Sequence, residues 1–267
     1  MVILNFKNFG EGEPLIIMHG LYGSSDNWVS IARELMQYFS VYIIDLRNHG
    51  ASPHLPEHNY NVMVNDLVEF MNDNEINRAI IMGHSMGGKV AMFFTAMHPE
   101  RVKKLVVVDI SPRSYEFDKG DRQIADHREI LGALALLDLQ HVKNRDEVNE
   151  LLAKAIPSAR VRQFLLKNIR RHKDKSFHWK INIDVLNQNL QSILIGLEDE
   201  KDALDMFTNR ALFIKGGNSN YIKNDDEVMI KEYFKNAQIV TIQGASHWLH
   251  AEKPDELVSV VKSFILS

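Results

Sequence analysis

A serine stands between glycines at residues 83–87, where the chain reads Gly-His-Ser-Met-Gly. The apolar run Ala79–Met82 before it predicts a buried strand, and the segment Gly88–Met97 after it predicts a helix. A turn this tight leaves no room for side chains beside the serine, which explains the flanking glycines. The pattern therefore predicts that Ser85 lies on a sharp strand-to-helix turn, with its hydroxyl exposed at the amino end of a helix.

A second segment, upstream, strengthens this motif, which by chance alone occurs in roughly one chain in ten of this length. Pro14–Met18 is typical of a buried strand and runs into the glycine-bearing loop His19–Gly23. Parallel strands place their carboxyl ends at one edge of a sheet. We therefore expect the backbone N–H groups of Leu21 and Met86 to point at one oxygen atom, as in an oxyanion hole. His19 is better interpreted as a support for the loop than as a proton-transfer group.

A third segment lies near the end of the chain. Ala237–Ile242 alternates as a strand does, and the loop after it carries His247, Trp248 and His250. Most of the 12 histidines must serve structure or face solvent. His247 is the predicted base because it follows the strand directly, whereas His250 comes one helical turn later. Trp248 is a candidate for the wall of a substrate pocket.

Taken in order, these segments resemble the α/β-hydrolase family, and more closely the small bacterial serine esterases typified by YbfF. The matching stretches span nearly the whole chain: Asp45–Ser52, Gly83–Lys89, Gly216–Ser219 and His247–Asp255. The resemblance implies an α/β-hydrolase fold, with a mostly parallel central sheet, helices on both faces and an inserted helical cap. It also implies a serine hydrolase that cleaves carboxylic esters through an acyl-enzyme, and we expect these esters to carry small or medium acyl groups.

The acid that partners the histidine departs from the common family pattern. Many α/β-hydrolases carry an aspartate in a Gly-x-x-Asp arrangement after the strand that follows the cap, but here Gly216–Ser219 ends in serine. Asp109, directly after the apolar strand Leu105–Val108, is the predicted replacement, and the YbfF-like esterases place the acid there with Ser219 close to the histidine. The competing acids are Asp225 and Asp226, interpreted as a solvated helix start, and Asp45, interpreted as holding the loop around Arg47 and His49.

Strand and helix patterns alternate up to Pro112, as in a mostly parallel sheet, and the sheet pattern returns at Ala211–Ile214. The sequence between them is charged and helical. We therefore predict a core at 1–112 and 206–267 and a helical cap at 113–205 that lies over Ser85 and lines the acyl or alcohol pocket. Within the cap, the spacing predicts helices over Ile130–Leu137, after a cap residue at Asn144, and over Val161–Ile169.

Basic residues gather in the second half of this insertion: Arg160, Arg162, Lys167, Arg170, Arg171, Lys173 and Lys175. Such a cluster attracts phosphate groups, for example those of an acyl-coenzyme A thioester. On one helix, however, Arg160, Lys167 and Arg171 share a face opposite Val161 and Leu165, which favours a solvated surface. Trp28 and Trp179 are interpreted as core or interface residues.

Composition excludes several classes. The 267 residues are 45% hydrophobic with a formal net charge of -4, enough for a sizeable core and without the basic excess of a nucleic-acid-binding protein. The absence of cysteine excludes disulfides, thiolate zinc sites and a cysteine nucleophile. The first ten residues turn polar too soon for a signal peptide, and no apolar run reaches the ~18 residues of a membrane span. We expect a cytoplasmic protein with no membrane or nucleic-acid partner; no oligomeric state is predicted.

The predicted chemistry is acyl transfer to water. Ser85 attacks an ester carbonyl, His247 takes the serine proton and Asp109 steadies the imidazole, with no metal or organic cofactor required. An acyl-coenzyme A thioesterase or a carbon–carbon bond hydrolase would use the same residues, because the cap pocket selects the substrate. Dehalogenases and epoxide hydrolases need a carboxylate in place of Ser85. A receptor on an inactive hydrolase fold is disfavoured because every required group is present.

Overall fold

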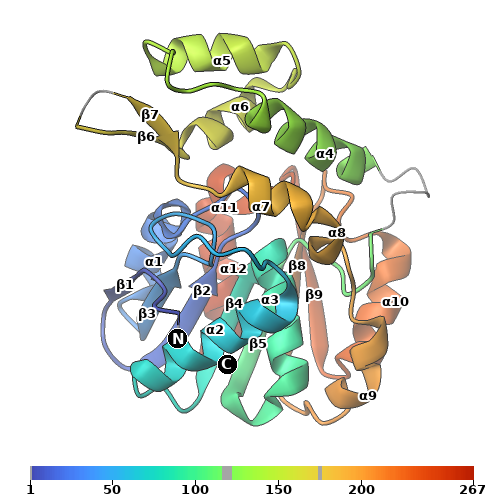
Figure 1. Ribbon diagram of the computed structural model, residues 1–267. Helices are drawn as coiled ribbons and strands as arrows, with labels where there is room; N and C mark the ends of the chain where they lie inside the picture. The colour runs from blue at the N-terminus through green and yellow to red at the C-terminus, as the bar shows by residue number, and fades with distance from the viewer. Residues whose placement is uncertain (1, 116–121, 174–175) are drawn as a thin grey trace.

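Apolar strands form the centre of the molecule. The computed structural model describes residues 2–115, 122–173 and 176–267, and in them seven strands form one sheet in the order β1-β3-β2-β4-β5-β8-β9 (Figure 1). They are β1 (Phe6–Phe9), β2 (Glu13–Met18), β3 (Phe39–Ile44), β4 (Ala79–His84), β5 (Val102–Val108), β8 (Ala211–Gly216) and β9 (Ala237–Ile242). Among the described strands of this sheet, only β1, an edge strand that the sequence analysis did not predict, pairs antiparallel. The predicted mostly parallel sheet is confirmed.

Helices cover both faces of this sheet, which is why the central strands are apolar along their length. One face packs against α2 (Tyr60–Asp73), α3 (Met86–Met97), α9 (Lys201–Leu204) and α10 (Asn224–Tyr233). The other packs against α1 (Val29–Leu35), α11 (Leu249–Glu252) and α12 (Pro254–Leu266). Short 3₁₀ turns lie at Ser25–Trp28, Pro99–Arg101 and Glu198–Glu200. Within the described part of the chain, no helix combines the length and the apolar character needed to cross a membrane.

A helical segment lies over the carboxyl ends of the parallel strands, at the top of Figure 1. This end of the sheet is the sheet edge that carries Ser85. The helical segment contains α4 (Arg122–Ala135), α5 (Arg145–Ala153), α6 (Ala159–Leu166), the hairpin of β6 (Ile169–Arg171) and β7 (Phe177–Trp179), α7 (Ile183–Gln188) and α8 (Leu190–Ile193). Asn144 caps α5 as predicted, since its side chain accepts a hydrogen bond from the Glu147 N–H at 2.9 Å. Farther along the chain, α9 packs against α3.

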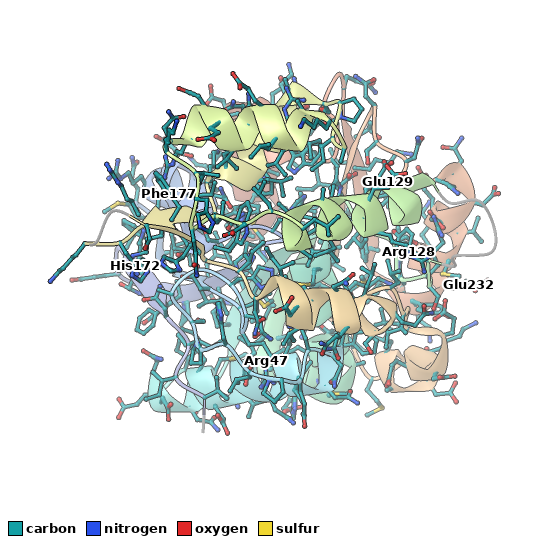
Figure 2. The ribbon with its side chains drawn as sticks, turned by 45° about the horizontal axis from the view of Figure 1, so that its top comes forward. Arg47, Arg128, Glu129, His172, Phe177 and Glu232 are labelled. Atoms are coloured by element: carbon teal, nitrogen blue, oxygen red, sulfur yellow. The ribbon has the colours of Figure 1, made fainter. Side chains whose placement is uncertain are left out.

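The hairpin corrects one sequence-based prediction. Helix α6 ends at Leu166, and Ile169, predicted as helical, begins strand β6. The side chain of Asn168 donates a hydrogen bond to the Tyr22 carbonyl at 2.7 Å, which fixes the chain where it leaves the helix. Arg171 therefore does not share a helix face with Arg160 and Lys167. Figure 2 places the hairpin, marked by His172 and Phe177, at the opposite end of the helical segment from Glu129 on α4.

Candidate active site

The turn between β4 and α3 carries Ser85. Its backbone has φ 51° and ψ -120°, the positive φ that a sharp turn imposes on a non-glycine residue. The Ser85 N–H donates to the Val108 carbonyl at 3.0 Å, which ties the turn to strand β5. A Cβ atom at Gly87 would lie 2.5 Å from the carbonyl oxygen of His19, so only glycine fits where the helix starts. The predicted strand-to-helix turn is present.

The loop after β2 runs against this serine. A Cβ atom at Gly20 would lie 2.8 Å from Nδ1 of His84 and 3.0 Å from Cβ of Ser85, so the two backbones approach closely. His19 is buried, donates from Nδ1 to the Gly20 carbonyl at 2.8 Å and accepts at Nε2 from the Leu46 N–H at 3.0 Å. Burial lowers the pKa of His19, which keeps the ring neutral. Because both of its ring nitrogens are bonded to backbone, His19 supports the loop and is not available for proton transfer.

Asp109 and His247 meet beside this turn. Nδ1 of His247 donates to Oδ2 of Asp109 at 2.8 Å, and Asp109 is completely buried. The carboxylate also accepts from the Gly216 N–H at 2.9 Å and from the Ser219 hydroxyl. Asp109, like Ser85, has a positive φ, of 52°, and its own N–H donates to the Ile214 carbonyl at 2.8 Å. Three donors thus fix the orientation of one carboxylate, and with it the ring of His247.

Ser219 holds a more specific position than the sequence analysis predicted. Its hydroxyl donates to Oδ2 of Asp109, the same oxygen that accepts the proton of the His247 ring. The serine therefore lies near the histidine, as expected, but its hydrogen bond supports the acid. The serine where many family members have an aspartate is thus part of the same network as the displaced acid.

The competing acids are engaged elsewhere. Asp226 accepts from the Lys223 N–H at 2.7 Å and lies 3.1 Å from Arg113, while Asp225 is exposed in the first turn of α10. Asp45 accepts hydrogen bonds from the backbone N–H groups of Ser25 at 2.6 Å and Ala51 at 2.9 Å, and so holds two loops together. Asp109 is the acid that contacts His247.

Two neighbours of His247, Tyr221 and His84, were not predicted. The Tyr221 ring stacks on its imidazole, with centroids 3.7 Å apart and planes inclined by 17°. His84, the residue before the serine, donates from Nε2 to the His247 carbonyl at 2.8 Å. His250 is buried and stacks on Trp28 with centroids 5.0 Å apart, and burial lowers its pKa to about 3. The sequence signal was limited to the spacing of His247 from His250, which correctly separated the two.

The helical segment reaches this network through His127 of α4. Its Nε2 lies 2.9 Å from the Tyr221 hydroxyl, and its Nδ1 lies 3.3 Å from the hydroxyl of Tyr22. Burial, followed by the proximity of His247, lowers the pKa of His127 to about 4. A neutral His127 therefore connects α4 to the tyrosine that stacks on His247.

A cavity of about 490 Å³ opens between the helical segment and the sheet edge. Ser85, His247, Leu21, Ser219 and Trp248 line it, so the structure brings these predicted site residues to one space. Its other walls include apolar residues of the helical segment: Ile130, Ile156, Val161, Phe164 and Leu165. Across the described ranges, no group of three or more histidine, aspartate or glutamate side chains is arranged to hold a metal ion.

A second, much smaller pocket of about 30 Å³ adjoins Ser85 on the side of Met86. Lys89 lines it, although this lysine is only 1% exposed. Its ammonium donates to the carbonyls of Pro112 at 2.9 Å and Arg113 at 2.6 Å, and burial lowers its pKa to about 7. Met86, whose amide was predicted to serve the oxyanion hole, thus borders the small pocket, whereas Leu21 borders both spaces.

Residues 13–254 match the family model described as alpha/beta hydrolase fold. The chain belongs to the α/β-hydrolase family. This α/β-hydrolase is 46% identical to a solved structure named marine microorganism esterase, with a TM-score of 0.93 and coverage of 99% of this chain and 100% of that chain. It is 38% identical over 251 residues to a putative esterase/lipase of Haemophilus influenzae, covering 94% of this chain and 82% of the relative. It is 33% identical over 259 residues to esterase YbfF of Escherichia coli, covering 97% and 95%. The predicted family is confirmed.

Proposed function

We propose that this α/β-hydrolase is a serine esterase that cleaves carboxylic esters of small molecules through an acyl-enzyme on Ser85. The observation that carries the proposal is the hydrogen bond of 2.8 Å between Asp109 and His247, in a network that borders the same cavity as Ser85. The three relatives described above are all named esterases, which supports the same reaction class.

The first half of the reaction forms the acyl-enzyme. Oγ of Ser85 attacks the ester carbonyl carbon while Nε2 of His247 accepts its proton. Asp109 holds Nδ1 of His247 in the protonated form and balances the positive charge of the imidazolium. His247 then gives its proton to the leaving alkoxide, which departs as the alcohol.

The oxyanion forms beside two backbone amides, those of Leu21 and Met86. Met86 is the first residue of α3, so its N–H lies at the positive end of the helix dipole. The close approach of Gly20 to Ser85 brings the loop of Leu21 to the other side of the reacting carbonyl. Each such donor typically contributes about 2.7–4 kcal/mol to transition-state stabilisation. Water, activated by His247, then attacks the acyl-enzyme and releases the carboxylic acid and free Ser85.

Residues 113–205 act in this proposal as a cap that shapes the substrate cavity, and residues 1–112 and 206–267 as the catalytic core. The apolar side chains that α4 and α6 contribute to the cavity support this division. The cytoplasmic location predicted from the sequence stays a prediction, which cell fractionation would test.

Covalent labelling with a fluorophosphonate tests the proposed function. We expect one equivalent of label on wild-type protein, mapped by peptide mass spectrometry to Ser85, together with hydrolysis of p-nitrophenyl acetate. Ser85→Ala should lose both, whereas Ser111→Ala, which changes another buried serine, should keep them. Labelling that persists in Ser85→Ala would overturn the assignment of the nucleophile.

A further inference from the structure

Two unequal spaces meet at Ser85, one of about 490 Å³ and one of about 30 Å³. Both are bordered by Leu21, His127 and Tyr221. Only the large cavity is bordered by His247, and only the small pocket is bordered by Met86. The two halves of an ester therefore face very different amounts of room and different chemical groups.

The chemistry assigns the halves to the spaces. The leaving oxygen must lie within reach of the imidazole that protonates it, so the alcohol portion extends along the side of His247. The oxyanion faces the amides of Leu21 and Met86. The remaining substituent of the tetrahedral carbon, the acyl chain, then points away from His247 and toward the small pocket.

We propose that the small pocket takes the acyl group and the large cavity takes the alcohol, so that the preferred substrates are acetyl or propionyl esters of bulky apolar alcohols. This inference rests on the proposed function. A water-sized group needs about 10–15 Å³, so the small pocket of about 30 Å³ accepts roughly two heavy atoms beyond the carbonyl. The large cavity exceeds it more than tenfold and accommodates a two-ring alcohol.

The polarity of the small pocket narrows the acyl group further. The hydroxyl of Tyr60 donates to the Ile193 carbonyl at 2.5 Å, and the hydroxyl of Tyr115 donates to the Tyr221 carbonyl at 2.8 Å. The ammonium of Lys89 is bonded to two further carbonyls. These polar ends are turned to the backbone, which leaves side chains such as Ile110, Ile193 and Leu194 to contact a short apolar acyl chain.

Two matched ester series test the assignment. In the first, p-nitrophenyl acetate, butyrate and hexanoate vary the acyl chain on one alcohol. In the second, ethyl, benzyl and 4-phenylbenzyl acetate vary the alcohol on one acyl group. We expect kcat/KM to fall at least tenfold from acetate to hexanoate, and to rise at least tenfold from ethyl to 4-phenylbenzyl acetate. Equal rates on acetate and hexanoate would overturn the assignment.

Two variants separate the spaces. Leu194→Ala enlarges the small pocket and should raise the hexanoate-to-acetate ratio of kcat/KM at least tenfold. Leu194 is buried, so its truncation also removes packing from the core. A second variant, Ala155→Phe, avoids this because Ala155 is exposed, and it narrows the large cavity. It should lower kcat/KM for 4-phenylbenzyl acetate and leave the hexanoate-to-acetate ratio unchanged. An Ala155→Phe effect on acyl-chain length would place the acyl group in the large cavity and refute the proposal.

Labelling and hydrolysis together distinguish a protein that is not a serine esterase from an esterase whose acyl group occupies the large cavity. Wild-type protein that hydrolyses neither ester series and takes no fluorophosphonate label would refute the serine esterase itself. Protein that is labelled at Ser85 and hydrolyses esters, but with no preference for short acyl groups, would refute only the assignment of the two spaces.

Discussion

The sheet edge and the helical segment above it are built by different means. At the edge, Ser85, Asp109 and His247 are fixed by backbone turns and by hydrogen bonds among buried groups. The helical segment contributes apolar walls to the large cavity, and His127 connects it to Tyr221. Buried polar bonds demand one geometry, whereas apolar walls tolerate exchange of similar side chains. Reaction type should therefore be sensitive to the sheet edge and substrate choice to the helical segment.

Removing the nucleophile at the sheet edge is expected to cause the largest loss of kcat. Ser85→Ala should lower kcat by on the order of a million-fold, because no other group replaces the attacking oxygen. Kinetics on p-nitrophenyl acetate, with circular dichroism to verify folding, measure the loss. A variant that keeps most of its activity would show that the sheet edge does not carry the chemistry.

Changing the acid should come second. Asp109→Asn should lower kcat by roughly ten-thousand-fold, because an amide favours the wrong imidazole tautomer and cannot balance the imidazolium charge. Asp225→Asn is the matched control, since Asp225 is exposed on α10 and should tolerate the change. The kcat of the two variants is measured in parallel. If Asp225→Asn lost activity and Asp109→Asn kept it, the catalytic acid would be the one after the later strand.

Acid should weaken the fold beside the turn of Ser85, where the buried ring of His58 lies 3.4 Å from Sδ of Met86 and that of His250 stacks on Trp28. Burial lowers the pKa of both His58 and His250 to about 3, so the folded state keeps them neutral while the unfolded state protonates them near the ordinary value of 6.5. The unfolded state therefore binds more protons between about pH 6 and pH 3. As the pH decreases through this range, the free energy of unfolding decreases by up to about 1.4 kcal/mol per pH unit for each histidine. Urea unfolding at pH 7, 6 and 5 measures this dependence.

His250→Phe isolates one part of that dependence. The ring of His250 stacks on Trp28, and phenylalanine preserves an aromatic contact without a titratable group. The variant should lose stability less steeply below pH 6 than wild type does. An unchanged slope would mean that His250 is not a source of the acid sensitivity.

A smaller loss is expected for the serine that supports the acid. Ser219→Ala removes one of three donors to the Asp109 carboxylate, and the other two, from Gly216 and His247, remain. We expect kcat to fall about tenfold, in line with about 1.5 kcal/mol for a hydrogen bond to a charged group. A loss as large as that of Asp109→Asn would make Ser219 an equal partner of the acid.

The smallest change in kinetics is expected when Arg160, Lys167 and Arg171 of the helical segment are neutralised together. Arg160 pairs with Glu252, and Arg171 lies on β6 instead of on the helix of the other two, so the three do not form one anion-binding face. KM for acyl-coenzyme A thioesters relative to p-nitrophenyl esters should stay unchanged. A selective rise in KM for the thioesters would favour the thioesterase alternative and extend the role of the helical segment to phosphate recognition.

The sequence predicted the sheet edge better than the segment above it, for a physical reason. Strands such as Ala79–His84 are buried on both faces, so they can be recognised in the sequence as continuous apolar runs. The positions of Ser85 and Asp109 follow from those strands, because each residue directly follows a strand end. The short hairpin strand Ile169–Arg171 has too few residues to display a period of its own, and its apolar first residue fitted the preceding helix.

Contacts between distant segments were beyond sequence reasoning. Nothing local to Tyr221 indicates that its ring stacks on His247, and nothing local to His127 indicates that it bonds to Tyr221 from 94 residues away. The contact of Asp109 with His247 was the exception: the position of Asp109 directly after the apolar strand Leu105–Val108 predicted it, and the resemblance to YbfF-like esterases implied the same acid.

The positive φ angles of Ser85 and Asp109 have a consequence for how this protein responds to selection. Side chains with a Cβ atom are disfavoured in this backbone region, at a cost of order 1–3 kcal/mol each, whereas glycine adopts it freely. Selection for heat resistance alone would therefore drift toward glycine at Ser85, whereas glycine at Asp109 would leave the donors of Gly216, Ser219 and His247 without an acceptor. The most heat-resistant variants would then lack the nucleophile and be inactive. Thermostability and turnover pull in opposite directions here, so a stability screen must be coupled to an activity screen.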